Sequence, residues 1–296
     1  MGNLLINIFG VFLLIMAAYY LYLRLHPHAF DRQLEKQAAA AREKQKKGDS
    51  ERIGKRIIVP RDGLESVAVN LYKPHGIAKE SYPAVFIAHG GSFMDGDADQ
   101  LDTFCERAAD QWESVIISIN YATIDVHQIP YPQEEIRDTV MYFAIHASEF
   151  SLDAKKFAMM GFTAGAYLMV GACTFLKEKG FPVKGLIMVS PFVDDTQIRL
   201  CDIGAHVSPA VLVQTGTDAM KDRYPVYIEH MKTGGVDLTE RTYEDAVQGF
   251  MEYNNPEFAG DPMYQKTGAI SDEQENLARA CEIWLGSILS DWFEKE

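Results

Sequence analysis

The stretch best suited to nucleophilic chemistry is Gly161-Phe162-Thr163-Ala164-Gly165, which follows a short apolar run and opens a segment with helical periodicity. This is the context of a nucleophile elbow, a sharp strand-to-helix turn with the pattern G-x-S-x-G. The glycines let the chain turn tightly, the central side chain projects above the sheet, and the helix N-terminus favours developing negative charge. Thr163 occupies the central position. The pattern alone is weakly specific, because glycine pairs at this spacing are common.

A second feature is the turn His89-Gly90-Gly91, which directly follows the apolar run 84–88. In this position the backbone N–H groups of Gly90 and Gly91 could bind an oxyanion, and the N–H of Ala164 would complete the hole. The alternative interpretation is a tight glycine turn without a function.

The rest of the sequence indicates what positions these two turns. From Lys55 onward, short β-branched runs alternate with helical patterns, and the middle runs are continuously apolar, as in strands buried on both faces. This alternation predicts an α/β fold with a mostly parallel sheet of about eight strands and helices on both faces. The expected strands are Arg56–Val59, Ser66–Tyr72, Ala84–Ala88, Val115–Ile119, Phe157–Met160, Leu186–Val189, Ala210–Gln214 and Leu238–Tyr243. The expected helices are Ala98–Glu113, Pro132–His146, Ala164–Lys179, Arg223–Gly234 and Asp272–Phe293.

Three blocks of this sequence together resemble the hormone-sensitive-lipase-like branch of the α/β-hydrolase superfamily, the microbial carboxylesterases. The HGGG block of that family is similar to AVFIAHGGSFMDGD, and its NYRLAPE to GDSAGG block is similar to INYATIDVHQIPYPQEEIRDTVMYFAIHASEFSLDAKKFAMMGFTAGA. The acid-strand and GxxHGF blocks are similar to SPAVLVQTGTDAMKDR and TYEDAVQGF. These blocks run in the family's order from about Tyr82 to Phe250. The resemblance implies an α/β-hydrolase fold and hydrolysis of carboxylic esters by a Ser–Asp–His triad.

This sequence departs from the family at two of the three triad positions. Thr163 stands where the family has the nucleophilic serine, and Gln248 of Gln248-Gly249-Phe250 stands where it has histidine. Asp218 matches the acid. Because the spacing between Asp218 and Gln248 fits the family, we do not attribute the glutamine to a misaligned motif. A turn residue or helix cap is the alternative role for Asp218.

The glutamine is the more damaging change. An imidazole accepts the nucleophile's proton near neutral pH and hands it to the leaving group, whereas an amide has no comparable basicity. Gln248 could still donate hydrogen bonds to Asp218 and Thr163, which would keep the network as architecture. The extra methyl of Thr163 stiffens its side chain. Loss of the base alone lowers the rate by about six orders of magnitude in a serine-protease triad. An intact oxyanion hole still gives a roughly 10³–10⁴-fold effect over water.

Two other histidines are alternatives for a base. His127 lies in a loop before Pro130, and His206 precedes the strand that leads to Asp218. For both, the competing interpretation is an ordinary surface or structural imidazole.

Composition excludes several other functions. The net charge is −14, but residues 24–56 hold ten basic and five acidic side chains, whereas the chain beyond them holds 18 basic and 37 acidic ones. An acidic body argues against nucleic acid as a partner. The four cysteines show no CxxC pair and no metal-ligand spacing, so we expect neither a metal nor a cofactor. We interpret Asp95, Asp97 and Asp99 as solvated turn residues, with a metal site as the alternative. Cys173 and Cys281 are expected to be buried thiols.

The N-terminus predicts a membrane anchor. Residues 4–23 are apolar apart from Asn7 and three tyrosines, and 20 residues at about 1.5 Å each span a bilayer core of roughly 30 Å. A cleaved signal peptide is the alternative, but no basic residue precedes the apolar run. Basic residues follow it, which places the body in the cytoplasm by the positive-inside rule. We therefore expect an anchor over 1–23, a charged stalk over 24–54 and an α/β-hydrolase domain over 55–296.

Three functions remain open. The first is a membrane-anchored ester hydrolase with weak or unusual activity, favoured by the HGG turn, the elbow and the acid. The second is a pseudoenzyme that binds an acyl-type ligand or a protein partner at the membrane, favoured by the simultaneous loss of serine and histidine. The third is a purely structural tether, which the retained HGG and elbow blocks disfavour.

Overall fold

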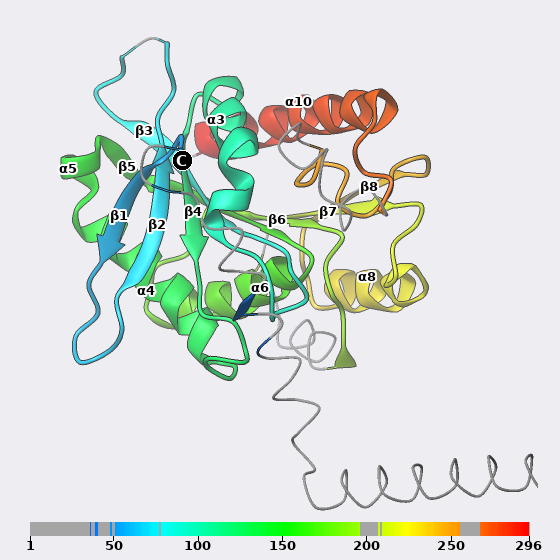
Figure 1. The fold of residues 1–296 in the computed structure, drawn as a ribbon, viewed down its shortest axis with the longest axis horizontal. Coiled ribbons are helices and arrows are strands. Elements are labelled where there is room, and N and C mark those ends of the chain that lie inside the picture. The colour runs from blue at the N-terminus through cyan, green and yellow to red at the C-terminus, as the bar shows by residue number, and fades with distance from the viewer. Residues whose placement is uncertain are drawn as a thin grey trace, which may run out of the picture. The chain divides into compact units, whose positions relative to one another are not determined.

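The computed structural model describes residues 51–76, 78–195, 207, 209–254 and 267–295, together with residues 36, 39, 40 and 48. The chain divides into two units, Met1–Lys44 and Gln45–Glu296, and the fold described below belongs to the second. Its described part contains an eight-stranded sheet with helices on both faces (Figure 1).

The sheet is mostly parallel, with the strand order β1-β2-β4-β3-β5-β6-β7-β8. Strand β2 runs antiparallel to β1 and β4, and all other neighbours are parallel. The carboxyl ends of the parallel strands therefore meet at one edge, where ligands bind in open α/β sheets. The strands are β1 (Lys55–Val59), β2 (Val67–Tyr72), β3 (Tyr82–Ala88), β4 (Val115–Asn120), β5 (Leu152–Phe162), β6 (Leu186–Val189), β7 (Ala210–Thr215) and β8 (Leu238–Tyr243).

Helices cover the sheet in two layers, each with its own apolar core (Figure 1). The side chains of β3 show the alternation that feeds both cores, because Phe86 packs with the α4, α6 and α8 layer and Ile87 with the α3 and α10 layer. The helices are η1 (Ala98–Leu101), α3 (Asp102–Gln111), α4 (Tyr131–Ile145), α5 (Ala147–Phe150), α6 (Ala164–Glu178), η2 (Lys221–Arg223), α8 (Tyr224–Thr233) and α10 (Asp272–Glu294).

The mostly parallel eight-stranded sheet predicted from the sequence is confirmed. Strand β5 begins at Leu152, five residues before the expected strand, because its more polar first half continues the extended chain beside Tyr82. The expected helix over 98–113 begins as a 3₁₀ turn. Cys173 and Cys281 are buried free thiols, as expected.

The predicted membrane anchor, residues 4–23, and most of the predicted stalk lie outside the described residues. Within the part of the chain that the structure describes, no helix has both the length and the apolar character needed to span a bilayer.

The interpretation of the acidic loop as solvated is wrong for two of its three carboxylates. Asp97 and Asp99 are buried, and Asp95 is half-buried. The Asp97 side chain caps η1 by accepting a hydrogen bond of 2.9 Å from the Asp99 backbone N–H. Among the described residues, no group of His, Cys, Asp and Glu side chains is arranged to hold a metal ion.

Asp99 instead ties the start of the domain to the segment after β3. Its carboxylate pairs with Arg52 at 2.9 Å and with Arg56 at 2.5 Å, and it accepts a hydrogen bond of 2.7 Å from the Asn70 amide. Asp102 accepts hydrogen bonds from the two backbone N–H groups that follow Arg52. Contacts with the folded body therefore begin before β1 itself.

A second buried ionic contact joins α3 to α10. Arg107 donates to both carboxylate oxygens of Glu282 at 2.8 and 2.9 Å, and Arg279 donates to the same carboxylate at 2.6 Å. Burial raises the pKa of Glu282 to about 7, while Arg107 acts in the opposite direction. The charged form of Glu282 is stable in this place only because the arginines pair with it, since a buried charge without a partner is strongly unfavourable.

The substitution Arg107→Met should therefore lower the free energy of unfolding by about 1–3 kcal/mol, since Glu282 would retain only Arg279. Urea unfolding followed by circular dichroism measures the change. The control is Lys79→Met, which removes the partner of the exposed Glu113 and should have little effect. Equal losses in the two variants would contradict the structural importance of the Arg107–Glu282 contact.

Candidate active site

Thr163 occupies a sharp turn between β5 and α6. Its backbone has φ 45° and ψ −107°, a conformation that is a genuine outlier for a β-branched residue. The turn is held on both sides, because the Thr163 N–H donates to the Val189 carbonyl at 2.9 Å and the Thr163 carbonyl accepts from the Phe192 N–H at 3.1 Å. The surrounding structure thus fixes a strained backbone that places the Thr163 side chain at the carboxyl edge of the sheet.

Two glycines allow this turn. A Cβ on Gly161 would lie 2.4 Å from the backbone nitrogen of Ala166, and a Cβ on Gly165 would lie 2.3 Å from the Ala88 carbonyl oxygen. Neither glycine can carry a side chain without moving backbone. Because these glycines carry no side chains, the first turn of α6 can pack against the end of β3, where the HGG turn begins.

The HGG turn is equally tight. Gly91 has φ 126°, and its carbonyl accepts hydrogen bonds from the N–H groups of Met94 at 3.1 Å and Asp95 at 2.8 Å. Outside the regular helices and strands, no hydrogen bond among the described residues uses the N–H of Gly90, Gly91 or Ala164. These three predicted oxyanion donors therefore belong to two turns that the glycines bring together.

His89 supports this turn. Its Nδ1 lies 2.7 Å from the Gly90 carbonyl oxygen, and its ring stacks on Tyr121 with centroids 4.2 Å apart. The Tyr121 hydroxyl in turn donates to the His89 carbonyl at 2.7 Å. The fully buried imidazole thus shapes the turn.

The loops after β7 and β8 carry Asp218 and Gln248, and hydrogen bonds connect them. The Gln248 N–H donates to the Thr217 hydroxyl at 3.3 Å. From α10, the Gln274 amide accepts from the Val247 N–H at 2.9 Å and donates to the carbonyl of residue 245 at 2.8 Å. The Gln248 backbone is therefore positioned from two sides.

The side chains of these loops do not form the hydrogen-bond network that the sequence suggested. The Asp218 carboxylate accepts from the Tyr224 hydroxyl at 2.5 Å and from the Met220 N–H at 2.8 Å. In the described residues, no hydrogen bond joins the Gln248 side chain to Asp218 or to Thr163. Tyr224 and the Met220 N–H therefore each bind one oxygen of the Asp218 carboxylate.

The alternative bases are not placed at this site by any described contact. The His127 Nε2 lies 3.2 Å from a carboxylate oxygen of Glu65 in the β1–β2 connection, and its ring stacks on Tyr131 at 4.0 Å. His206 lies outside the described residues.

Glu252 is a site residue that the sequence did not reveal. It is 2% exposed, and in the described part of the chain neither carboxyl oxygen has a hydrogen-bond partner. A Cβ on Gly90 would lie 2.7 Å from the Thr163 hydroxyl oxygen, 3.4 Å from the Tyr253 hydroxyl and 3.6 Å from Glu252 Oε1. The carboxyl group of Glu252 therefore converges with the Thr163 hydroxyl on the space beside Gly90.

Burial dominates the electrostatics of Glu252. It raises the pKa of this carboxyl to about 8, its own backbone N–H acts in the opposite direction, and the negative charge of Asp218 raises the value further. The influence of Asp218 puts Glu252 within electrostatic reach of the predicted acid. The only indication in the sequence is an acidic residue four positions after Gln248, and its burial depends on the tertiary structure.

Comparison with known proteins identifies the fold. A family profile described as alpha/beta hydrolase fold matches residues 85–203, a range that includes the HGG turn and the elbow but ends before Asp218 and Gln248. The acetyl esterase of Salmonella choleraesuis is 29% identical over 123 residues, which are 42% of this chain and 37% of that protein. The acetyl esterase of Salmonella paratyphi B is 30% identical over 113 residues, which are 38% and 34%. The chain thus aligns with little more than a third of the length of these curated relatives.

Solved structures match over much more of the chain. The Pyrobaculum calidifontis esterase superimposes with a TM-score of 0.65 at 18% identity, over 88% of this chain and 91% of that one. The carboxylesterase EstE1 from a metagenomic library gives 0.65 at 18% identity, over 91% and 98%. A fungal esterase from Rhizomucor miehei gives 0.67 at 18% identity, over 81% and 84%.

The chain has the α/β-hydrolase fold, and its sequence is similar to that of esterases with this fold. In a hydrolase of this fold, the elbow and the HGG turn lie at the carboxyl ends of the strands, as they do here.

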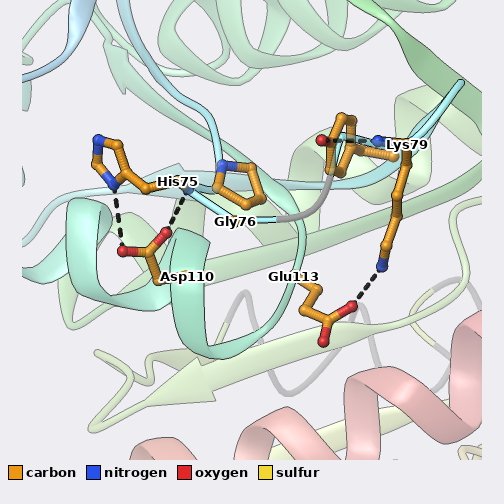
Figure 2. A pocket seen from close by; sticks show the side chains of 7 residues that line it. His75, Gly76, Lys79, Asp110 and Glu113 are labelled. Atoms are coloured by element: carbon orange, nitrogen blue, oxygen red, sulfur yellow. Dashed lines mark hydrogen bonds and ion pairs between the residues drawn. The ribbon is translucent and has the colours of Figure 1, made fainter.

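A pocket of about 360 Å³ lies elsewhere on this domain (Figure 2). Figure 2 shows His75 paired with Asp110 and Lys79 paired with Glu113 around it. These residues precede β3 or β4, so the pocket lies toward the amino ends of the parallel strands, at the opposite edge from Thr163. The position rule for α/β sheets therefore disfavours it as the active site.

The raised pKa of Glu252 predicts a pH-dependent stability. Because the folded state holds the proton up to about pH 8 while an unfolded glutamate releases it near 4.5, the free energy of unfolding should fall as pH rises between these values. The Glu252→Gln variant has no carboxyl at this position, so its free energy of unfolding should not fall in this way. It should match wild type in acid and exceed it at alkaline pH by a margin on the order of a few kcal/mol. Urea unfolding at a series of pH values measures the difference, and parallel curves for the two proteins would contradict the buried neutral carboxyl.

Proposed function

We propose that this chain is a slow hydrolase of carboxylic esters in which the Thr163 hydroxyl is the nucleophile. The observation that carries the proposal is the turn at Thr163, whose positive φ and ψ of −107° are maintained with a β-branched residue. Strained backbone of this kind persists only where the surrounding structure enforces it, and it is characteristic of functional sites. A structural role alone gives no reason to retain a hydroxyl in such a turn.

The remaining groups fit acyl transfer. The Thr163 oxygen would attack the ester carbonyl carbon, and the electron pair of the carbonyl would move onto its oxygen. The N–H groups of Gly90, Gly91 and Ala164 would stabilise that oxyanion, aided by the N-terminus of α6. Collapse of the intermediate would release the alcohol and leave an acyl-threonine, which water then hydrolyses.

Low turnover follows from the amide that Gln248 places where the family has an imidazole. An amide neither accepts the proton of the nucleophile nor returns one to the leaving group, and Asp218 is engaged by Tyr224. Asp218 then stabilises the loop after β7 through its bonds to Tyr224 and Met220. The related acetyl esterases support short acyl groups as the substrate class.

A pseudoenzyme is the second function that an observation favours. The same Tyr224–Asp218 bond gives the acid a structural role, so the site above the elbow would bind an acyl-type ligand or a protein partner without turnover. Labelling with a fluorophosphonate separates the two functions, because covalent modification at Thr163 requires a reactive hydroxyl.

The test of hydrolysis is the rate of p-nitrophenyl acetate cleavage by the full chain in mild detergent. Wild type should show a saturable rate that Thr163→Ala loses. The double variant Thr163→Ser plus Gln248→His should raise kcat/KM by roughly 10²-fold or more, because it supplies a titratable base. A wild-type rate no higher than that of Thr163→Ala would refute the hydrolase and favour the pseudoenzyme.

We further propose that residues 4–23 anchor the chain in a membrane with the hydrolase domain in the cytoplasm. The uncharged length of this segment and the basic residues that follow it support the proposal. Protease added to sealed inverted vesicles should digest the domain, whereas protease added to right-side-out vesicles should not. The reverse pattern would overturn the orientation, and recovery in the soluble fraction would overturn the anchor.

A further inference from the structure

We propose that the Glu252 carboxylate, rather than the Gln248 amide, is the group that takes the proton from the Thr163 hydroxyl. The inference rests on the proposed function, because it names the missing base for the Thr163 nucleophile. It goes beyond the family pattern, which places the base at the position of Gln248.

The geometry that supports this role is the convergence beside Gly90. Thr163 Oγ1 and Glu252 Oε1 lie 2.7 and 3.6 Å from the point where a Gly90 Cβ would stand. The two oxygens are not hydrogen-bonded to each other in this structure. Contacts between a nucleophile and its base are commonly long in the absence of substrate and shorten in the reacting complex. One bridging water, or a rotation of the carboxyl, would connect them in the reacting complex.

The environment of Glu252 gives it no structural task that would explain its burial. Both carboxyl oxygens lack a hydrogen-bond partner in the described part of the chain, unlike Asp99 and Glu282, which are bound by arginines. A buried polar group without partners is unfavourable, and such groups cluster at functional sites. The unsatisfied carboxyl thus lies beside two hydroxyl groups, those of Thr163 and Tyr253, and Thr163 is the one at the nucleophile position.

The titratable groups that face Glu252 are few. Asp218 faces it from the loop after β7, and the Tyr253 phenol approaches the same space from the next residue in the chain. At the end of β3, the His89 ring is held by the Gly90 carbonyl and Tyr121. Among the described residues, no lysine or arginine forms an ion pair with Glu252.

Glu252 can accept and return the proton in each half of the reaction. As the Thr163 oxygen bonds to the carbonyl carbon, its proton moves to the Glu252 carboxylate. When the intermediate collapses, the carbon–oxygen bond to the leaving group breaks and Glu252 returns the proton to the departing alkoxide. In the second half, Glu252 takes a proton from the attacking water and returns it to Thr163 as the carboxylic acid leaves.

Burial and Asp218 determine when Glu252 is charged. Because they raise its pKa to about 8, only a small fraction is ionised at neutral pH. Hydrolysis should therefore increase about tenfold per pH unit below this value and level off above it, which gives a base that works best in mild alkali.

The experiment measures kcat/KM of the full chain for p-nitrophenyl acetate from roughly pH 6 to pH 10. Wild type should show the rise and plateau centred near pH 8. Glu252→Gln keeps the shape of the side chain but should lower the plateau by roughly 10²-fold or more and remove the step. Glu252→Asp should lower kcat while keeping a pH step, because the carboxyl is retained but withdrawn. The matched control is Glu244→Gln, an exposed carboxylate in the same loop, which should keep the rate and the step.

A second variant identifies the base independently of any loss of stability. Adding Gln248→His to Glu252→Gln should restore activity with a step near the ordinary pKa of imidazole, about 6.5. Recovery of rate together with this shift shows that the Glu252→Gln protein is folded and lacks only a base.

The outcomes separate the two proposals. If wild type is no faster than Thr163→Ala at any pH, both the hydrolase and its base are refuted. If Thr163-dependent hydrolysis keeps its step in Glu252→Gln, the hydrolase stands and the assignment of Glu252 is wrong. If the step disappears only in Tyr253→Phe, the phenol is the base and the assignment is again wrong.

Discussion

The close approach of α6 to the end of β3 is the constraint on which the site depends. It exists because Gly161 and Gly165 carry no side chains, and it forces the residue between them into a left-handed backbone. From this one contact come the position of the Thr163 hydroxyl beside Gly90 and the approach of the N-terminus of α6 to the HGG turn. The parallel sheet brings the other two loops to the same edge. The chemistry that the site supports is therefore set by which side chains fill positions that the backbone already fixes.

Three buried carboxyl groups of this chain differ in how their burial is compensated. Asp99 and Glu282 are bound by arginines, and each joins segments that lie far apart in the sequence. Their charges are offset where they are buried, so they contribute to the architecture. Glu252 has no such partner, and its pKa rises because the neutral form is favoured. Asp99 and Glu282 therefore stabilise the fold, whereas the burial of Glu252 requires another explanation.

The sequence predicted the architecture well because the fold depends on local patterns. Continuous apolar runs such as VIISI at β4 and the glycine spacing around Thr163 determine strands and turns with little help from distant residues. The ionic clusters could not be predicted this way, since Asp99 sits in what reads as a polar loop and is buried by Arg52, 47 positions earlier. Glu252 was missed for the same reason, because nothing adjacent to it indicates burial. The hydrogen bond from Tyr224 to Asp218 was also not predicted, because nothing in the sequence indicates that the side chain of the first residue of α8 points back to the loop after β7.

The two arginines that bracket the entry to β1 have a mechanical consequence. β1 is the edge strand, and it pairs antiparallel to β2 with Lys55 opposite Leu71 at the end where the chain enters the sheet. A force applied to the N-terminal segment would peel such a strand one hydrogen bond at a time, which is the weakest direction of loading. Arg52 and Arg56 are fastened to Asp99 at that same end, so traction would fall first on a buried ion pair instead of on the hydrogen bonds of the sheet edge. Tension transmitted from outside the domain is thereby resisted before it reaches the strands that carry the site.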